Sequence, residues 1–353
     1  YASPHPLPFT SFISTSVVKP IDFDNDGDAD LLVGERFDPF VYGMGGRGFL
    51  LENDGKGLFS DATKRYAPFL LNAGMITDID VQDFDKDGWQ DILLVGDWMP
   101  IVMLKNERGN FINVSQRLGF QATEGWWQDI ESGDFNQDGK IDFVLGNHGL
   151  NTFFKPDDRM YVSDFDGNGS IEQIFCTKVS GKYYPIVDKD DLLSQLPSLK
   201  KELVYYRDYG KRSIDEIFPE SILRNARVFE VKLLASVLLL SVENGYKRIQ
   251  LPLEAQYSPL YSMLISDFDD DGIDDVIAGG NQYQVKPQFG RYDASRAWFF
   301  KGVLNGVTFT FEAGKDLNVK GQIRDIENVE VNGETFILFA KYDSDLEILK
   351  IRD

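Results

Sequence analysis

The segment Asp22–Gly34 reads DFDNDGDADLLVG, and four further segments of the chain repeat its pattern. They are DFDKDGWQDILLVG (Asp83–Gly96), DFNQDGKIDFVLG (Asp134–Gly146), DFDGNGSIEQIF (Asp164–Phe175) and DFDDDGIDDVIAGG (Asp267–Gly280). Each has oxygen-bearing side chains at positions 1, 3, 5 and 9, a glycine at position 6 and an apolar run after position 9. A pattern that recurs five times indicates a repeat architecture, in which one small unit is copied along the chain.

The spacing of these oxygens predicts calcium-binding loops. Calcium takes six to eight oxygen ligands, and alternating carboxylates converge on one ion only if the backbone curls tightly, which a glycine at position 6 permits. EF-hands are excluded because they need a glutamate at position 12, where this chain has Val33, Leu94, Leu145, Phe175 and Ala278. Magnesium would take fewer protein ligands and more waters, so we expect four to five structural calcium ions.

The expected calcium ligands are four side chains and the backbone carbonyl of position 7 in each loop. In the first three loops they are Asp22, Asp24, Asp26, Asp28 and Asp30; Asp83, Asp85, Asp87, Trp89 and Asp91; and Asp134, Asn136, Asp138, Lys140 and Asp142. The fourth loop is the weakest match, with Asp164, Asp166, Asn168, Ser170 and Glu172, and the fifth offers Asp267, Asp269, Asp271, Ile273 and Asp275. The alternative for each Asp- and Gly-rich stretch is a plain solvated turn.

The chain is strongly acidic, and most of its net negative charge falls in the five segments. Its 353 residues include 36 basic and 57 acidic side chains, which gives a net charge of −21. Such a charge disfavours nucleic acids and anionic membrane surfaces as partners. The single cysteine, Cys176, excludes an internal disulfide and a thiolate zinc cage. The longest apolar run, Leu233–Val242, is about half the length of a membrane-spanning helix and is expected to be a buried strand.

Strand-like stretches flank the loops, and hairpin turns containing glycine follow them, which favours β-propeller blades over a sandwich. The pattern D-F-D-x-D-G-x-x-D followed by an apolar run resembles the FG-GAP/VCBS repeat of integrin α-subunit propellers and secreted bacterial proteins. The flanking segments VGDWMPIVMLKNERGNF and EGWWQDIESGDFNQDGKIDFVLGNHGLN are similar to VCBS-repeat proteins of the cartilage-acidic-protein/UnbV type, typical of Bacteroidetes surfaces. The resemblance implies an all-β fold, with a single β-propeller of seven blades over residues 1–353. Direct counting of the repeats instead favours six blades.

Two regions depart from the repeat. Residues 188–226 place leucines at helical intervals and are expected to form a helical insertion, which either caps a blade edge or forms a lid over a ligand site. Residues 321–353 alternate strands and turns without the aspartates, which predicts a degenerate last blade that closes with the N-terminal region.

The resemblance also implies that the calcium loops lie on one face and that a ligand binds the opposite face. The expected ligand-binding residues are Arg36, Trp98, Trp126, Trp127, His148, Asn151, Tyr283, Arg291 and Tyr292; packing between blades is the alternative for each. Aromatic, amide and arginine side chains suit a glycan or protein ligand. We therefore expect a non-catalytic binding or adhesion protein, secreted or on a bacterial outer surface, where a segment outside this sequence could anchor it. The alternative is a polysaccharide lyase or hydrolase that uses His148, Arg291, Tyr292 or a carboxylate pair under the insertion.

Overall fold

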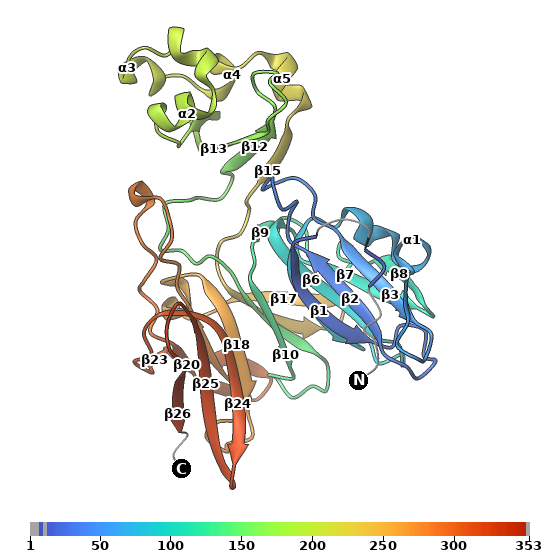
Figure 1. Cartoon of the computed structure of the whole chain (residues 1–353). Helices are drawn as coiled ribbons and strands as arrows, with labels where there is room; N and C mark the ends of the chain where they lie inside the picture. Colours follow the sequence, from blue (N-terminus) through green and yellow to red (C-terminus); the bar gives the residue numbers. More distant parts are fainter. Residues whose placement is uncertain (1–6, 10–12, 351–353) are drawn as a thin grey trace.

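The computed structural model describes residues 7–9 and 13–350, which fold mostly into antiparallel β-sheets (Figure 1). The first sheet contains β1 (Thr15–Ile21), β2 (Asp30–Glu35), β3 (Gly48–Asn53) and β4 (Phe59–Asp61). The second contains β5 (Met75–Gln82), β6 (Asp91–Met99), β7 (Val102–Glu107) and β8 (Asn110–Asn113), with the short β9 (Gly125–Trp126) beside β6. Helix α1 (Thr63–Tyr66) and a 3₁₀ turn (Pro68–Asn72) connect the two sheets.

Three further sheets continue this series. The third contains β10 (Asp129–Gly133), β11 (Asp142–Gly146), β16 (Val237–Val242) and β17 (Gly245–Gln250). The fourth contains β18 (Leu260–Ser266), β19 (Asp275–Gly280), β20 (Trp298–Phe300) and β23 (Lys315–Asp316), with the hairpin β21 (Gly302–Asn305) and β22 (Thr308–Phe311) beside it. The fifth contains β24 (Gln322–Val331), β25 (Glu334–Tyr342) and β26 (Glu347–Lys350).

The five sheets pack in chain order around a common axis. Strand β1 lies against β5, β5 against β10, β10 against β18, and β18 against β24, so the first strand of every sheet is innermost. These five strands together line an axial pocket of about 460 Å³. Each neighbouring pair of sheets shares an apolar core, as Ile21 and Leu32 do with Ile79 and Ile92 between the first two. This is the arrangement expected of propeller blades.

The predicted blade counts of seven and six are not confirmed, because the described residues supply five sheets of this kind. A sixth sheet stands apart in a separate unit, which projects from the five sheets at the top of Figure 1. It contains β12 (Arg159–Ser163), β13 (Glu172–Val179), β14 (Lys182–Pro185) and β15 (Arg227–Glu230). The same unit holds α2 (Lys189–Gln195), a 3₁₀ turn (Pro197–Lys201), α3 (Tyr206–Tyr209), α4 (Ile214–Ile217) and α5 (Glu220–Asn225).

This insertion unit, residues 159–230, is larger than the helical segment expected at 188–226, and it has its own core. Leu192, Leu196 and Ile214 of the helical part pack against Phe165 and Ile174 of the sheet. The unit interrupts the third sheet, in which Leu145 of β11 pairs with Val237 of β16. The helices therefore cover a sheet inside the insertion rather than a blade edge of the main body.

The fifth sheet has three strands in the described part of the chain, and β1 pairs with β2 of the first sheet. Closure of the last blade by the N-terminal region stays a prediction, because residues 1–6 and 10–12 lie outside the described residues. Within the described residues, the helices are too short and too polar to span a bilayer.

Candidate metal centres and ligand face

The five aspartate-rich segments form the turns between adjacent strands, and their backbones share one geometry. The turns join β1 to β2, β5 to β6, β10 to β11, β12 to β13 and β18 to β19. In each, the N–H of the position-6 glycine donates to the position-1 carboxylate, as Gly88 does to Asp83 at 2.8 Å and Gly272 to Asp267 at 2.7 Å. Gly88 has φ +88°, a left-handed conformation that residues with a side chain rarely adopt.

The position-9 carboxylate of each loop is buried and fixes the loop to the sheet. In four of the loops its two oxygens accept from the position-2 N–H and from a backbone N–H in or next to the third strand, as Asp91 does from Phe84 at 3.3 Å and Asn106 at 2.7 Å. In the fourth loop Glu172 accepts from the N–H of Phe165 at 3.1 Å. Burial raises the pKa of Asp91 to about 7 and those of Asp30, Asp142 and Asp275 to about 6. A cation beside these groups would offset the cost of burying their charge.

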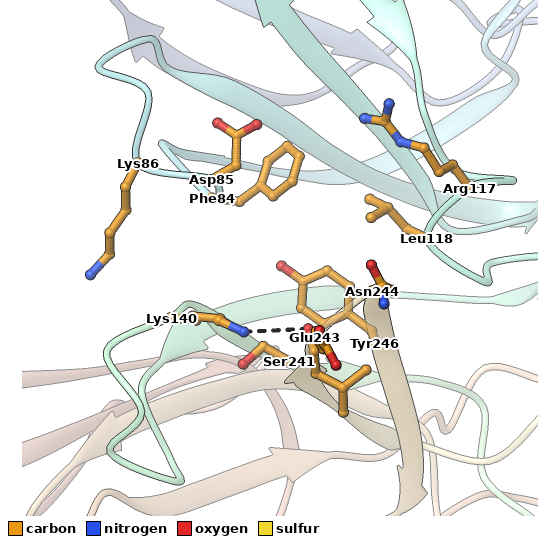
Figure 2. A pocket seen from close by; sticks show the side chains of 12 residues that line it. Phe84, Asp85, Lys86, Arg117, Leu118, Lys140, Ser241, Glu243, Asn244 and Tyr246 are labelled. Atoms are coloured by element: carbon orange, nitrogen blue, oxygen red, sulfur yellow. Dashed lines mark hydrogen bonds between the residues drawn. The ribbon is translucent and has the colours of Figure 1, made fainter.

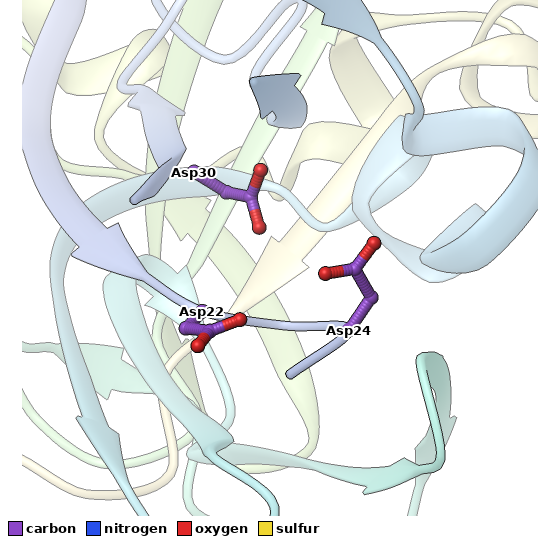
Figure 3. A group of neighbouring side chains, drawn as sticks. All are labelled: Asp22, Asp24 and Asp30. Atoms are coloured by element: carbon purple, nitrogen blue, oxygen red, sulfur yellow. The ribbon is translucent and has the colours of Figure 1, made fainter. Parts of the chain in front are cut away.

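Four loops bring three carboxylates close enough to hold a metal ion, with ligand oxygens within 4.8 Å of one another. Figure 3 shows the first of these groups, in which the carboxylates of Asp22, Asp24 and Asp30 face a common space. The other groups are Asp83, Asp85 and Asp91; Asp164, Asp166 and Glu172; and Asp267, Asp269 and Asp271. The third loop has Asn136 in place of one carboxylate and keeps the same turn, with Gly139 donating to Asp134 at 2.8 Å.

Two observations show that these groups fit a bound cation. Asp22 Oδ1 is buried and has no hydrogen-bond partner in the described structure, although a buried carboxylate oxygen ordinarily has one. In the second and fifth loops a lysine ammonium already lies among the carboxylates: Lys105 Nζ is 2.7 Å from Asp87, and Lys301 Nζ is 2.7 Å from Asp271. Lys105 also pairs with Asp85, and Lys301 with Asp269.

The two lysines were not among the predicted site residues. They come from the strand that pairs with the second strand of each sheet, since Lys105 lies in β7 and Lys301 directly follows β20. The first loop has Glu52 at the corresponding position, next to Asn53, whose N–H donates to Asp30. The connections that precede these strands differ in length, so no fixed sequence spacing marks the lysines.

Replacing Lys105 is expected to strengthen calcium binding by the second loop. Lys105→Met removes a positive charge that competes for the same carboxylates, and two partly exposed ion pairs of this kind contribute about 1 kcal/mol. We therefore expect the dissociation constant of one calcium site to fall by roughly fivefold in a calorimetric calcium titration. Lys247→Met, on exposed β17, is the control and should leave every site unchanged. An unchanged or weaker site in Lys105→Met would contradict the competing role of the lysine.

The three tryptophans expected on the ligand face are buried. Trp127 is 0% exposed and lies in the core between the second and third sheets. For this residue the alternative, packing between blades, is therefore confirmed. Trp98 and Trp126 pack edge to face at 4.8 Å, and Trp98 also contacts Phe175 and Phe229 of the insertion sheet. The insertion unit thus covers Trp98, and His148 and Phe154 cover Trp126, so these rings offer no surface to a ligand.

Three other predicted residues form internal contacts near the same end of the sheets. Arg36 pairs with Asp97 at 3.0 Å, and about a third of its side chain stays exposed. The His148 ring lies edge to face against Trp126 and Tyr292, its Nε2 is 3.1 Å from Thr152 Oγ1, and burial lowers the pKa of the imidazole to about 4. Tyr292 is 6% exposed and its hydroxyl is 2.9 Å from Thr152 Oγ1.

Asn151, Tyr283 and Arg291 remain accessible at the end of the sheets away from the metal loops. Asn151 and Tyr283 follow β11 and β19, strands that begin at a metal loop and run to the opposite end. The Arg291 guanidinium lies 3.5 Å from the ring centroid of Tyr283 and pairs with exposed Asp293 at 3.4 Å. The Thr152–Tyr292 contact holds the two connections next to each other.

Residues 22–94 and 83–145 match the FG-GAP-like repeat family, so the chain carries FG-GAP-like repeats in its first three sheets. A comparison with curated proteins gives no match. Among solved structures, the chain is similar to the Vibrio cholerae biofilm matrix protein Bap1 (14% identity, TM-score 0.34, 88% of this chain and 41% of that one).

Two further structures show similarity over nearly the whole chain. One is an Agrocybe aegerita lectin specific for non-reducing terminal N-acetylglucosamine (14% identity, TM-score 0.31, 96% of this chain and 81% of that one). The other is the NanB sialidase of Streptococcus pneumoniae (13% identity, TM-score 0.34, 99% of this chain and 52% of that one). The chain thus spans about half or less of Bap1 and the sialidase. These scores are too low to transfer the activity of any of these proteins.

Proposed function

We propose that this protein is a non-catalytic, calcium-stabilised scaffold that binds a glycan at the end of its sheets opposite the metal loops. The observation that carries the proposal is the accessible group of Asn151, Tyr283 and Arg291. A stacked tyrosine–arginine pair and an amide are side chains that recognise sugar rings and their hydroxyls. A protein ligand on the same surface is the alternative outcome.

Calcium is the proposed ion for the loops, since their carboxylate, amide and carbonyl oxygens are the ligands that calcium prefers. Loops of this kind fill where calcium is near millimolar, which supports an extracellular or outer-surface location. His148 is one of the candidate bases of the enzyme alternative, and for this residue the burial of the ring and its contact with Thr152 favour a structural role.

A glycan array probed with the calcium-loaded protein tests the proposal. We expect retention on a defined group of glycans and at least tenfold weaker binding by Tyr283→Ala and Arg291→Ala, because an aromatic anchor and a charged hydrogen bond each contribute about 1.5 kcal/mol. Val307→Ala, an 89% exposed residue in the β21–β22 turn, is the control. Binding that ignores both variants, or an array without any retained glycan, would refute glycan binding at this surface.

A further inference from the structure

A hollow of about 470 Å³ lies between the second and third sheets, on the side of the molecule that carries the metal loops. Figure 2 shows its walls. The loop after β5 and the turn after β8 form one wall, and the third metal loop with the β16–β17 turn forms the other. The side chains that matter are Phe84, Lys86, Arg117, Leu118, Lys140 and Tyr246.

The floor of this hollow is apolar and held in place. Tyr246 lies in the centre of the view, and its ring packs on Phe120 and Phe143 with centroid distances of 5.6 Å. Its N–H donates to the carbonyl of Leu118 at 3.3 Å, which joins the two walls. Gly245 has φ +120°, and a Cβ there would lie 2.8 Å from the same carbonyl oxygen. This close approach fixes the tyrosine at the bottom of the hollow.

Three cations surround the floor, and none of them has a carboxylate partner among the described residues. Lys86 and Lys140 come from the second and third metal loops, and Arg117 from the turn after β8. The nearest recorded partner of Lys140 Nζ is the carbonyl of Val242 at 3.5 Å. Of the two acidic side chains in the lining, Asp85 pairs with Lys105, which leaves Glu243 alone.

This positive lining is not a general property of the spaces between sheets. The corresponding hollow between the fourth and fifth sheets, on the same side, has the opposite character. Its charged side chains are Asp267, Asp270, Glu330 and Glu334 against the single Lys350. In the hollow between the second and third sheets, the carboxylates of Asp85, Asp91, Asp138 and Asp142 in the two adjoining metal loops act on Tyr246. Once these loops hold calcium, the three unpaired cations around the aromatic floor mark a place where an anion is attracted.

We infer that the hollow between the second and third sheets is a binding site for an acidic saccharide, a uronate-type sugar whose ring lies on Tyr246 and Phe84. The carboxylate of such a sugar can accept two parallel hydrogen bonds from a guanidinium such as Arg117. The lysines would attract a second acidic sugar of the same saccharide, since the cations stand on both sides of the floor (Figure 2). This site is separate from the surface around Tyr283.

Calorimetry with tri-galacturonate and its methyl ester tests the inference on the full chain in the presence of calcium. The two probes share their rings and differ in charge, so the acid is expected to bind at least tenfold more tightly than the ester. Arg117→Gln and Lys86→Gln should each weaken binding of the acid about tenfold, because a charge-assisted hydrogen bond contributes about 1.5 kcal/mol. Both residues are exposed, so the melting temperature should not change.

Lys56→Gln, an exposed lysine outside the hollow, and Tyr283→Ala are the controls and should leave the affinity for tri-galacturonate unchanged. Equal binding of acid and ester, or binding that survives both Arg117→Gln and Lys86→Gln, would overturn the inference. Loss of binding in Tyr283→Ala would overturn it as well, because it would assign the acid to the proposed glycan surface. If the glycan array retains no glycan while tri-galacturonate still binds in the hollow, only the proposed glycan surface around Tyr283 is refuted.

Discussion

Removal of calcium is expected to lower the melting temperature of this protein by on the order of 10–20 °C. At millimolar calcium, a site with the affinity typical of extracellular modules stabilises the folded state by about 1–2 kcal/mol. Four such sites would add to the stability of the folded state, because an ion in each loop would hold together two consecutive strands of one sheet. The metal-free loops keep three carboxylates within 4.8 Å of one another, which adds repulsion.

Differential scanning calorimetry with 2 mM calcium, and again with excess EGTA, would measure this shift. Magnesium added after chelation is the control for ionic strength and for nonspecific divalent binding, and it should restore only a small part of the loss. A melting temperature that is the same with calcium and with EGTA would contradict both the identity of the ion and its structural role.

Asp275→Ala is expected to destabilise the folded protein by about 3 kcal/mol or more. The carboxylate is 0% exposed and accepts hydrogen bonds from the N–H groups of Phe268 at 3.1 Å and Gly302 at 2.8 Å. The substitution leaves both donors without a partner and removes a predicted metal ligand. Urea denaturation in saturating calcium measures the free energy of unfolding.

Asp270→Asn, in the same loop, is the matched control. Asp270 is exposed and has φ +58°, a conformation that asparagine also adopts, so its replacement should change the free energy of unfolding by less than about 0.5 kcal/mol. Asp275→Asn keeps one acceptor oxygen, so its loss of unfolding free energy should lie between those of Asp275→Ala and Asp270→Asn. This variant provides the measurement if Asp275→Ala does not fold. Similar stability of Asp275→Ala and Asp270→Asn would refute the anchoring role of position 9.

The metal loops could be predicted residue by residue because their geometry is local. The turn from Asp83 to Asp91 is fixed by hydrogen bonds within nine residues, including those of Gly88 and Phe84, and these depend on the residue types in the pattern itself. The strands on both sides follow from the same segments. The fourth loop shows the limit of this reasoning, since Asp164–Glu172 forms the same turn in the insertion sheet instead of the main body.

The contacts that decide accessibility are made by residues far apart in the chain. Nothing near Trp98 in the sequence indicates that Phe175 and Phe229 cover it, because the insertion unit that brings them begins only after β11 of the next sheet. The same holds for Lys105 and Asp85, which meet because β7 pairs with β6. Spacing along the chain predicted which residues could bind a metal, whereas pairing between strands determined which cation meets them and which aromatic rings stay exposed.

The interruption of the third sheet has a consequence for how the chain folds during synthesis. β11 leaves the ribosome long before its partner β16, and the pairing of Leu145 with Val237 must wait for the whole insertion unit. If residues 159–230 fold first as an independent body, with β12 and β15 as hydrogen-bonded neighbours, the ends of the long connection are already close together. The entropy of closing the third sheet is then that of the much shorter loop formed by residues 147–158 and 231–236, and exchanging the unit for a short turn would preserve the register of β11 and β16 while uncovering Trp98.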